Sequence, residues 1–213
     1  MANRLLSLLA IALVCLSLSA LAEEAADNQS APPAYDPAKT MVAVLPVINE
    51  TGKEDKQADA LLACSRKAFD QELGNRGFQL VPEDTITKAI ADKKVDLTDE
   101  EFRTKKSLVE LGQAVGANII MMPLLQPTKD TISVGMFAKK KKEAVIDLKA
   151  VDVSTGMYVI NSSFKASAKG SAILGGLSKS GSLREEATRK AVTEALKEFL
   201  KPYKEIKKDK PAQ

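Results

Sequence analysis

The chain has 213 residues, of which 45% are hydrophobic and 28% charged, and its formal net charge is +3. This length suits one folded domain with tails, and so small a net charge predicts no nucleic-acid partner, because phosphate binding needs a concentrated basic face. The sequence has no histidine, which excludes Ser-His-Asp and Cys-His catalytic sites and histidine-based zinc sites. We therefore expect no catalytic residue, no metal and no cofactor, and we expect that the protein is not an enzyme.

Residues 1–22 have the three parts of a secretory signal peptide. Arg4 precedes an apolar run at 5–18, and Ala20-Leu21-Ala22 is a small-x-small cleavage signal. A retained membrane anchor is the alternative, although the run is short for a spanning helix. Cys15 lacks the small preceding residue of a lipidation signal, so the exported protein is expected to be periplasmic and not lipidated; secretion is the alternative.

The folded domain is expected to cover residues 41–201, after an acidic, proline-bearing flexible leader at 23–40. The valine-rich run at 41–48 predicts a strand that is buried on both faces. An amphipathic helix is expected at 57–73, followed by a short strand at 78–81.

A short helix is predicted to begin at Pro82, and Thr98 with Glu101 has the spacing of a capping box that opens a helix to about Val115. The apolar run at 118–126 predicts a second buried strand.

Strand patterns then replace helix patterns. Alternating apolar and polar residues at 131–138, 143–153 and 157–168 predict an antiparallel meander with one wet face. After a glycine-rich stretch at 170–181, a capping box of Ser182 and Glu185 predicts a helix to about Leu200, and residues 202–213 form a basic tail expected to be disordered. This order of elements favours an α/β (α+β) fold: a mixed β-sheet of about five strands with helices packed mainly on one face.

The densest charge run, Lys139, Lys140, Lys141 and Lys142, is predicted at the tip of a hairpin that begins near Phe137. A solvated turn that protects a strand edge is one interpretation, and contact with an anionic membrane or acidic polymer is the other.

The glycine-rich stretch holds Gly175, Gly176 and Lys179, and Gly176 with Gly181 has the glycine spacing of a phosphate loop. The lysine and hydroxyl residue that should follow are missing, so a flexible loop is expected, with weak anion capture as the alternative.

Cys64 is the one cysteine that remains after cleavage. It lies off the centre of its helix's apolar stripe and is expected to be partly exposed, with pairing between chains as a minor possibility.

The chain resembles the CsgG/TolB amino-terminal/LpoB-like α/β domain of bacterial envelope proteins. The resemblance is carried by VAVLPVINETG at 42–52, LGNRGFQLVPED at 73–84, ELGQAVGANIIMMPLL at 110–125 and DVSTGMYV at 152–159. It implies a domain that binds other envelope proteins, with possible self-association, and it brings no catalytic residues.

Two hypotheses follow from the residues and the resemblance. The first is an adaptor or accessory subunit that docks to envelope proteins in assembly, secretion or regulation. The second is a binding module for an anionic polymer, a membrane surface or a small ligand, through the lysines and the glycine-rich stretch.

Overall fold

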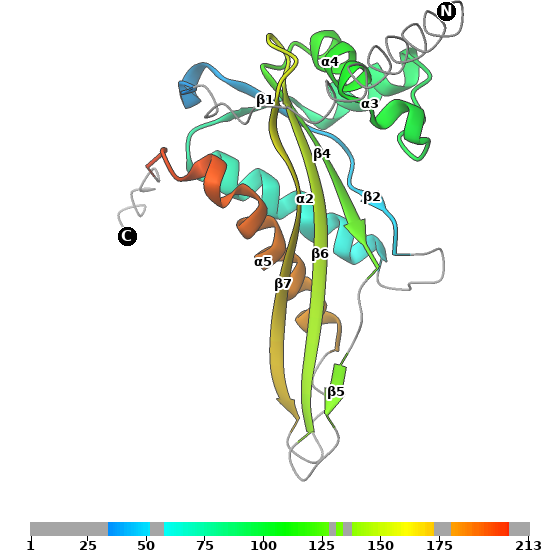
Figure 1. Cartoon of the computed structure of the whole chain (residues 1–213), viewed down its shortest axis with the longest axis vertical. Coiled ribbons are helices and arrows are strands. Elements are labelled where there is room, and N and C mark those ends of the chain that lie inside the picture. Colours follow the sequence, from blue (N-terminus) through cyan, green and yellow to red (C-terminus); the bar gives the residue numbers. More distant parts are fainter. Residues whose placement is uncertain (1–33, 52–57, 128–130, 134–137, 173–179, 205–213) are drawn as a thin grey trace, which may run out of the picture. The chain divides into compact units, whose positions relative to one another are not determined.

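The computed structural model describes residues 34–51, 58–127, 131–133, 138–172 and 180–204. Its strands are β1 (Met41–Val44), β2 (Ile48–Asn49), β3 (Gln79–Leu80), β4 (Ile119–Gln126), β5 (Thr131–Ser133), β6 (Ala138–Asp152) and β7 (Tyr158–Ala172). Its helices are α2 (Ala58–Asn75), α3 (Glu83–Asp92), α4 (Lys105–Ala114) and α5 (Ser180–Leu200), with 3-10 helices η1 (Pro37–Lys39) and η2 (Glu100–Arg103) (Figure 1). The expected signal peptide lies outside the described residues, and no described helix is long and apolar enough to cross a bilayer.

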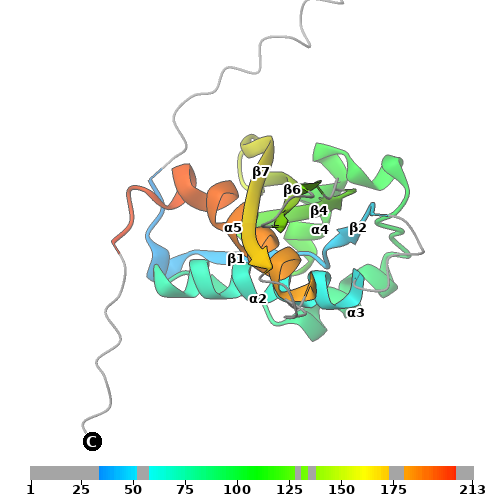
Figure 2. The ribbon, with the colours of Figure 1, turned by 90° about the horizontal axis from the view of Figure 1, so that it is seen from below.

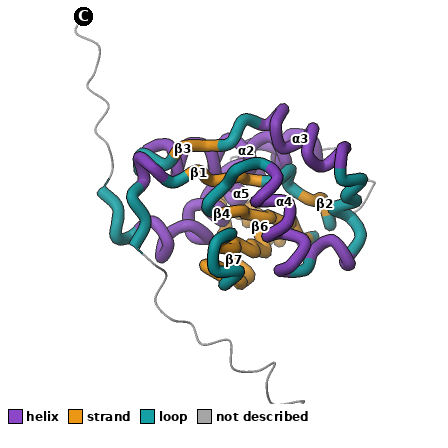
Figure 3. Tube along the Cα trace, turned by 90° about the horizontal axis from the view of Figure 1, so that it is seen from above, coloured by secondary structure: helices purple, strands orange, loops and turns teal. Residues whose placement is uncertain are grey.

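A mixed sheet organises the domain, as the sequence predicts. β1 is parallel to β3 on one side and to β4 on the other, and β2 continues beyond β1 along β4. β6 is antiparallel to β4, β5 and β7, so β3 and β7 occupy the two outermost positions across the sheet (Figure 3). Because β2 follows β1 and β5 follows β4 along the sheet, the seven strands occupy about five positions across it. The predicted α/β class, with a mixed sheet of about five strand positions, is confirmed.

Proline divides the first predicted strand. The run at 41–48 forms β1 and β2, with Pro46 between them. Proline has no N–H for a ladder hydrogen bond, so pairing stops there and resumes at Ile48.

The central strands are buried on both faces. Met121 and Met122 are both 0% exposed but belong to separate hydrophobic cores on opposite faces of the sheet. Successive side chains on a strand point to opposite faces. The continuous apolar run of β4 is therefore explained by a covered face on each side.

Helices cover both faces of this part of the sheet. The two longest, α2 and α5, share one core, to which α5 contributes an alanine-rich stripe (Figure 2). The shorter helices α3 and α4 share the second core through Ile86, Leu108 and Leu111, a second layer that the sequence pattern does not predict. Alanines at the α5 stripe allow the helix to lie close to the strands.

Local capping decides where the shorter helices begin. Thr98 and Glu101 do not form the expected capping box: Asp99 caps η2 and Thr104 caps α4, so the single expected helix is divided. Short polar side chains compete for nearby backbone N–H groups, which explains the displaced start. α5 begins at Ser180, before the residue expected to cap it, Ser182.

The folded region extends beyond both expected boundaries. Residues 34–40, which the sequence assigns to the leader, include η1 and the buried Thr40. The ring of Tyr35 lies 6.0 Å from Phe199, and Tyr203 of the predicted tail lies 5.1 Å from Phe78 and 5.9 Å from Phe199. Packing of these aromatic rings holds residues 34–40 and 201–204 against the domain.

Candidate functional site

The candidate functional site is built on a long hairpin of β6 and β7. The two strands pair in one register from Ala138 with Ala172 to Ala150 with Ile160, and after a register shift Val151 pairs with Tyr158. β4 accompanies β6 only from Val145 to Asp152, so the rest of the hairpin continues past it (Figure 1). The hairpin therefore carries much more surface than the central strands, which are buried.

One face of this hairpin is polar, and we call it the open face. Directly paired residues share a face, so β6 and β7 contribute alternating positions to it. Its members are Lys141, Glu143, Val145, Asp147 and Lys149 of β6 and Asn161, Ser163, Lys165, Ser167 and Lys169 of β7. None of the ten side chains is buried, and Asn161, Ser163, Lys165 and Lys169 are exposed, which confirms the predicted wet face of the meander.

Helical cover on this face stops at Lys149. The Lys149 ammonium group donates a hydrogen bond to the carbonyl oxygen of Arg103 at 3.1 Å, which ties the end of η2 to β6. Farther along β6, Asp147 accepts a hydrogen bond from the Gln126 amide at 2.6 Å, within the sheet. The remaining members lie beyond these contacts.

An ion cluster occupies the middle of the open face. Glu143 accepts from the ammonium groups of Lys141 at 2.7 Å and of Lys165 at 2.6 Å. Hydrogen bonds from these two lysines, together with their charges, lower the pKa of Glu143 to about 2. The carboxylate therefore stays ionised across the physiological range, and it crosslinks β6 to β7.

The structure corrects the predicted position of the four lysines. Lys139, Lys140, Lys141 and Lys142 lie within β6, paired with β7 on one side and partly with β5 on the other, and not at a hairpin tip. Lys141 faces Glu143, whereas the Lys142 side chain is 6% exposed on the helix-covered face. Lys141 and Lys142 therefore lie on opposite faces, so the lysine side chains that the structure describes do not form one basic patch.

The remaining predicted site residues lie outside the described part of the chain. These are Phe137, Gly175, Gly176 and Lys179. At the start of the glycine-rich stretch, Gly170 still belongs to β7, where an added Cβ would lie 2.8 Å from Leu183 Cδ1. That glycine is explained by the close approach of α5 to the strand.

The outer edge of β7 is the second feature of the site. Within the described residues β7 pairs with β6 alone, so its other edge carries main-chain groups with no strand partner. The strand has no proline and no acidic residue, and Asn161, Ser162 and Ser163 are exposed near its middle. Long edges of this kind are templates for pairing with another chain.

A hydrogen-bond cluster holds the turn between the two strands. One carboxylate oxygen of Asp152 accepts from the backbone and hydroxyl groups of Ser154 and Thr155, and the other accepts from the Tyr35 hydroxyl at 2.8 Å. Burial alone would raise the pKa of Asp152, but the hydrogen bonds from Ser154, Thr155 and Tyr35 outweigh it and lower the pKa. The pKa of Tyr35 is raised, by burial first and then by Asp152.

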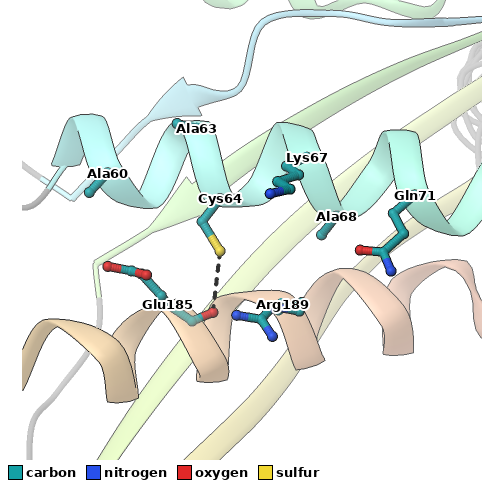
Figure 4. Close-up of a pocket in the computed structure, with 8 residues that line it drawn as sticks. All are labelled: Ala60, Ala63, Cys64, Lys67, Ala68, Gln71, Glu185 and Arg189. Atoms are coloured by element: carbon teal, nitrogen blue, oxygen red, sulfur yellow. Dashed lines mark hydrogen bonds between the residues drawn. The ribbon is translucent and has the colours of Figure 1, made fainter.

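A groove of about 440 Å³ lies between α2 and α5, on the side away from the open face (Figure 4). It is lined by Ala60, Ala63, Cys64, Lys67, Ala68 and Gln71 of α2 and by Glu185 and Arg189 of α5. Cys64 is half-buried, as expected, and its thiol donates to the carbonyl oxygen of Glu185 at 3.5 Å. The groove offers charge and a thiol, but the sequence has no histidine to activate that thiol.

Glu143 and Tyr35 are functional-site residues that the sequence pattern does not predict. Glu143 lies two residues after Lys141, a spacing that places both on one strand face if the alternation is extended back through the lysines. Tyr35 is an aromatic residue in an otherwise small and polar leader, which signals a residue that is buried. No cluster of three or more acidic or cysteine side chains suited to a metal occurs in the part of the chain that the structure describes.

The sequence matches no protein-family model and no curated protein. Among solved structures the fold is similar to lipoprotein GNA1162 from Neisseria meningitidis, with 17% identity, 68% of this chain and 90% of that chain covered, and a TM-score of 0.45. It is also similar to the hypothetical protein CT253 from Chlamydia trachomatis (16% identity, 73% and 95% covered, TM-score 0.47). A third similar structure is the LpoB C-terminal domain from Salmonella enterica (18% identity, 64% and 84% covered, TM-score 0.40). Because these TM-scores lie below 0.5, they assign neither a family nor a function to this chain.

Proposed function

We propose that this chain is an exported accessory protein of a bacterial envelope that works by binding other envelope proteins and catalyses no reaction. The observation that carries the proposal is the β6–β7 hairpin, whose open face and outer edge present polar side chains and main-chain groups on a rigid sheet. The signal-peptide pattern of residues 1–22 supports export to the periplasm.

The lysines on the open face suit protein recognition better than anion capture. Lys141 and Lys165 share one carboxylate, Glu143, and Lys142 is buried on the opposite face. An anionic polymer or bilayer is attracted by the summed charge of a cluster, and this arrangement neutralises or hides part of that charge. Fixed ion pairs instead provide orientation and specificity at a protein interface.

Mild crosslinking in the native envelope, followed by mass spectrometry of the tagged chain, tests the proposal. We expect the same protein partner in repeated experiments, in an envelope fraction. The double variant K165E/K169E changes the charge of the hairpin. As the matched control, K88E/K93E makes the same change on the exposed Lys88 of α3 and on the exposed Lys93 that follows its end.

Under the proposal, K165E/K169E lowers the yield of the crosslinked partner and K88E/K93E leaves it unchanged. Recovery of no consistent protein partner would refute protein binding. Equal losses with both double variants would show that net charge, and not the hairpin, determines the association.

A further inference from the structure

We infer that the outer edge of β7 accepts an extended segment of a partner protein that alternates apolar and acidic side chains and adds a strand to the sheet. This inference rests on the proposed function and names the kind of segment that the hairpin binds. Strand addition derives its affinity from main-chain hydrogen bonds and its specificity from alternate side chains.

The main chain of β7 provides the first argument. β7 runs from Tyr158 to Ala172 and pairs with β6 on one side, while no strand pairs with its other side in the described residues. Proteins protect such edges with prolines, bulges, charges or covering elements. The register shift lies at the turn end of the hairpin, near Ala150 and Val151, and leaves the rest of the edge regular.

The charges beside this edge select the chemistry of one face of the incoming strand. β7 contains Lys165 and Lys169 and no acidic residue. Both lysines are exposed on the open face, and the acid near them, Glu143, is already bound by Lys141 and Lys165. Lys169 has no ion pair within the described residues, so an acidic side chain at the next strand position would complement it.

Apolar side chains select the other face of the incoming strand. Ile160, Phe164 and Ala166 lie on the helix-covered side of β7, packed against the core but only partly buried. Apolar side chains on an added strand would cover their remaining exposed surface. A segment with period two, apolar towards α5 and acidic towards the open face, satisfies both requirements.

Neighbouring residues at the centre of the edge give a matched pair of blocking variants. Successive N–H groups of a strand point to opposite edges of that strand. One of the variants Ser162→Pro and Ser163→Pro therefore removes a hydrogen bond to β6, and the other removes an N–H donor that points to the outer edge. Thermal unfolding distinguishes them, because loss of the bond within the hairpin lowers the melting temperature more. The more stable variant is the specific test of the edge.

The probe is a short blocked peptide of alternating valine and glutamate, titrated into the full chain and followed by amide chemical shifts. Controls are the valine–lysine peptide and a peptide with the valines and glutamates in separate blocks. We expect the alternating acidic peptide alone to bind, with shifts along β7. The stable proline variant should abolish binding, and K165E/K169E should weaken it about tenfold at low salt.

The inference is wrong if neither peptide binds, if the acidic and basic peptides bind equally, or if the chemical shifts change in the α2–α5 groove. It is also wrong if a second copy of the chain, or residues 23–33, already covers the edge of β7 before the peptide is added. Envelope crosslinking of the stable proline variant separates this inference from the proposed function. If that variant keeps its partner, strand addition is wrong while protein binding stands. If the unaltered chain has no partner, the proposed function itself fails.

Discussion

Replacing Tyr35 with phenylalanine tests how residues 34–40 are held to the hairpin. The change removes the hydroxyl that donates to Asp152 at 2.8 Å but keeps the ring that packs on Phe199. A hydrogen bond to a charged group contributes about 1.5–3 kcal/mol, and Tyr35 is only half-buried, so we expect a loss near the lower value, about 1.5–2 kcal/mol. For a domain of this size the melting temperature should fall by about 3–8 °C.

Urea unfolding followed by circular dichroism measures this loss. The control is Tyr203→Phe, which removes the acceptor of the Tyr35 N–H bond at 2.9 Å, a bond between neutral groups that should contribute less. The pKa of Asp152 is lowered in the fold, so its stabilising contribution is present above the ordinary value of 3.8 and is lost as the pH falls through the folded value. The difference between Tyr35→Phe and the unaltered chain should therefore be full at pH 7 and shrink in acid. An unchanged urea midpoint at pH 7, or a larger loss for Tyr203→Phe, would refute the reasoning.

Other changes test the ion cluster and the two cores. In a carbon-13 NMR titration the pKa of Glu143 should be about 2, and Lys165→Met should raise it towards the ordinary 4.5. Because the folded pKa is depressed, the stabilisation that Glu143 brings is present above pH 4.5 and is lost as the pH falls through 2. A pKa that Lys165→Met leaves unchanged would contradict the ion pair. Gly112→Ala places a Cβ 2.5 Å from Val153 Cγ2 and should lower the free energy of unfolding by about 1–3 kcal/mol. Adding Val153→Ala should restore part of that stability. If the double variant is no more stable than Gly112→Ala alone, this contact is not the cause. Phe199→Ala removes a 4% exposed ring that contacts three other aromatic rings. The free energy of unfolding in denaturant should fall by about 3–5 kcal/mol. A fall of less than about 1 kcal/mol would mean that the ring cluster is not part of the core.

The strands of this fold could be predicted because their apolar and polar residues alternate, or form continuous apolar runs, in the sequence. The apolar run at 118–126 predicts a buried strand, and within it Met121 and Met122 are each buried in a different core. The alternation around Ile146 and Leu148 likewise predicts an inward row, and both residues are buried. The period decides which face a residue takes once a strand is recognised.

The lysine run shows no alternation of apolar and polar residues, because its four residues are identical, and the predicted position of the site is wrong for that reason. Four consecutive lysines favour a solvated turn when they are considered as a block. In the structure β6 includes them, and the pairing of Lys142 with Ala168 takes that lysine to the helix-covered face. Pairing with β7, which is distant in the sequence, overrides the local preference of the lysines for a solvated turn. The neighbouring residues in the sequence do not reveal this pairing.

The ends of the fold were also misjudged from local composition. Residues 34–40 resemble a leader because most of them are small or polar and one is a proline, yet Tyr35 is anchored by Asp152, 117 positions later in the chain. Tyr203 is anchored in the same way by aromatic rings on α5 and before β3. Contacts between distant residues decide these boundaries.

Site-specific photocrosslinking from the hairpin tests the central claim most directly. A photoreactive phenylalanine derivative is placed at Ser163, beside the outer edge of β7, and at Lys88, an exposed residue of α3, as the control. The account predicts that the Ser163 derivative captures one envelope protein repeatedly and that the Lys88 derivative does not. Capture of that protein from Lys88 with equal yield, or from Lys88 alone, would contradict it.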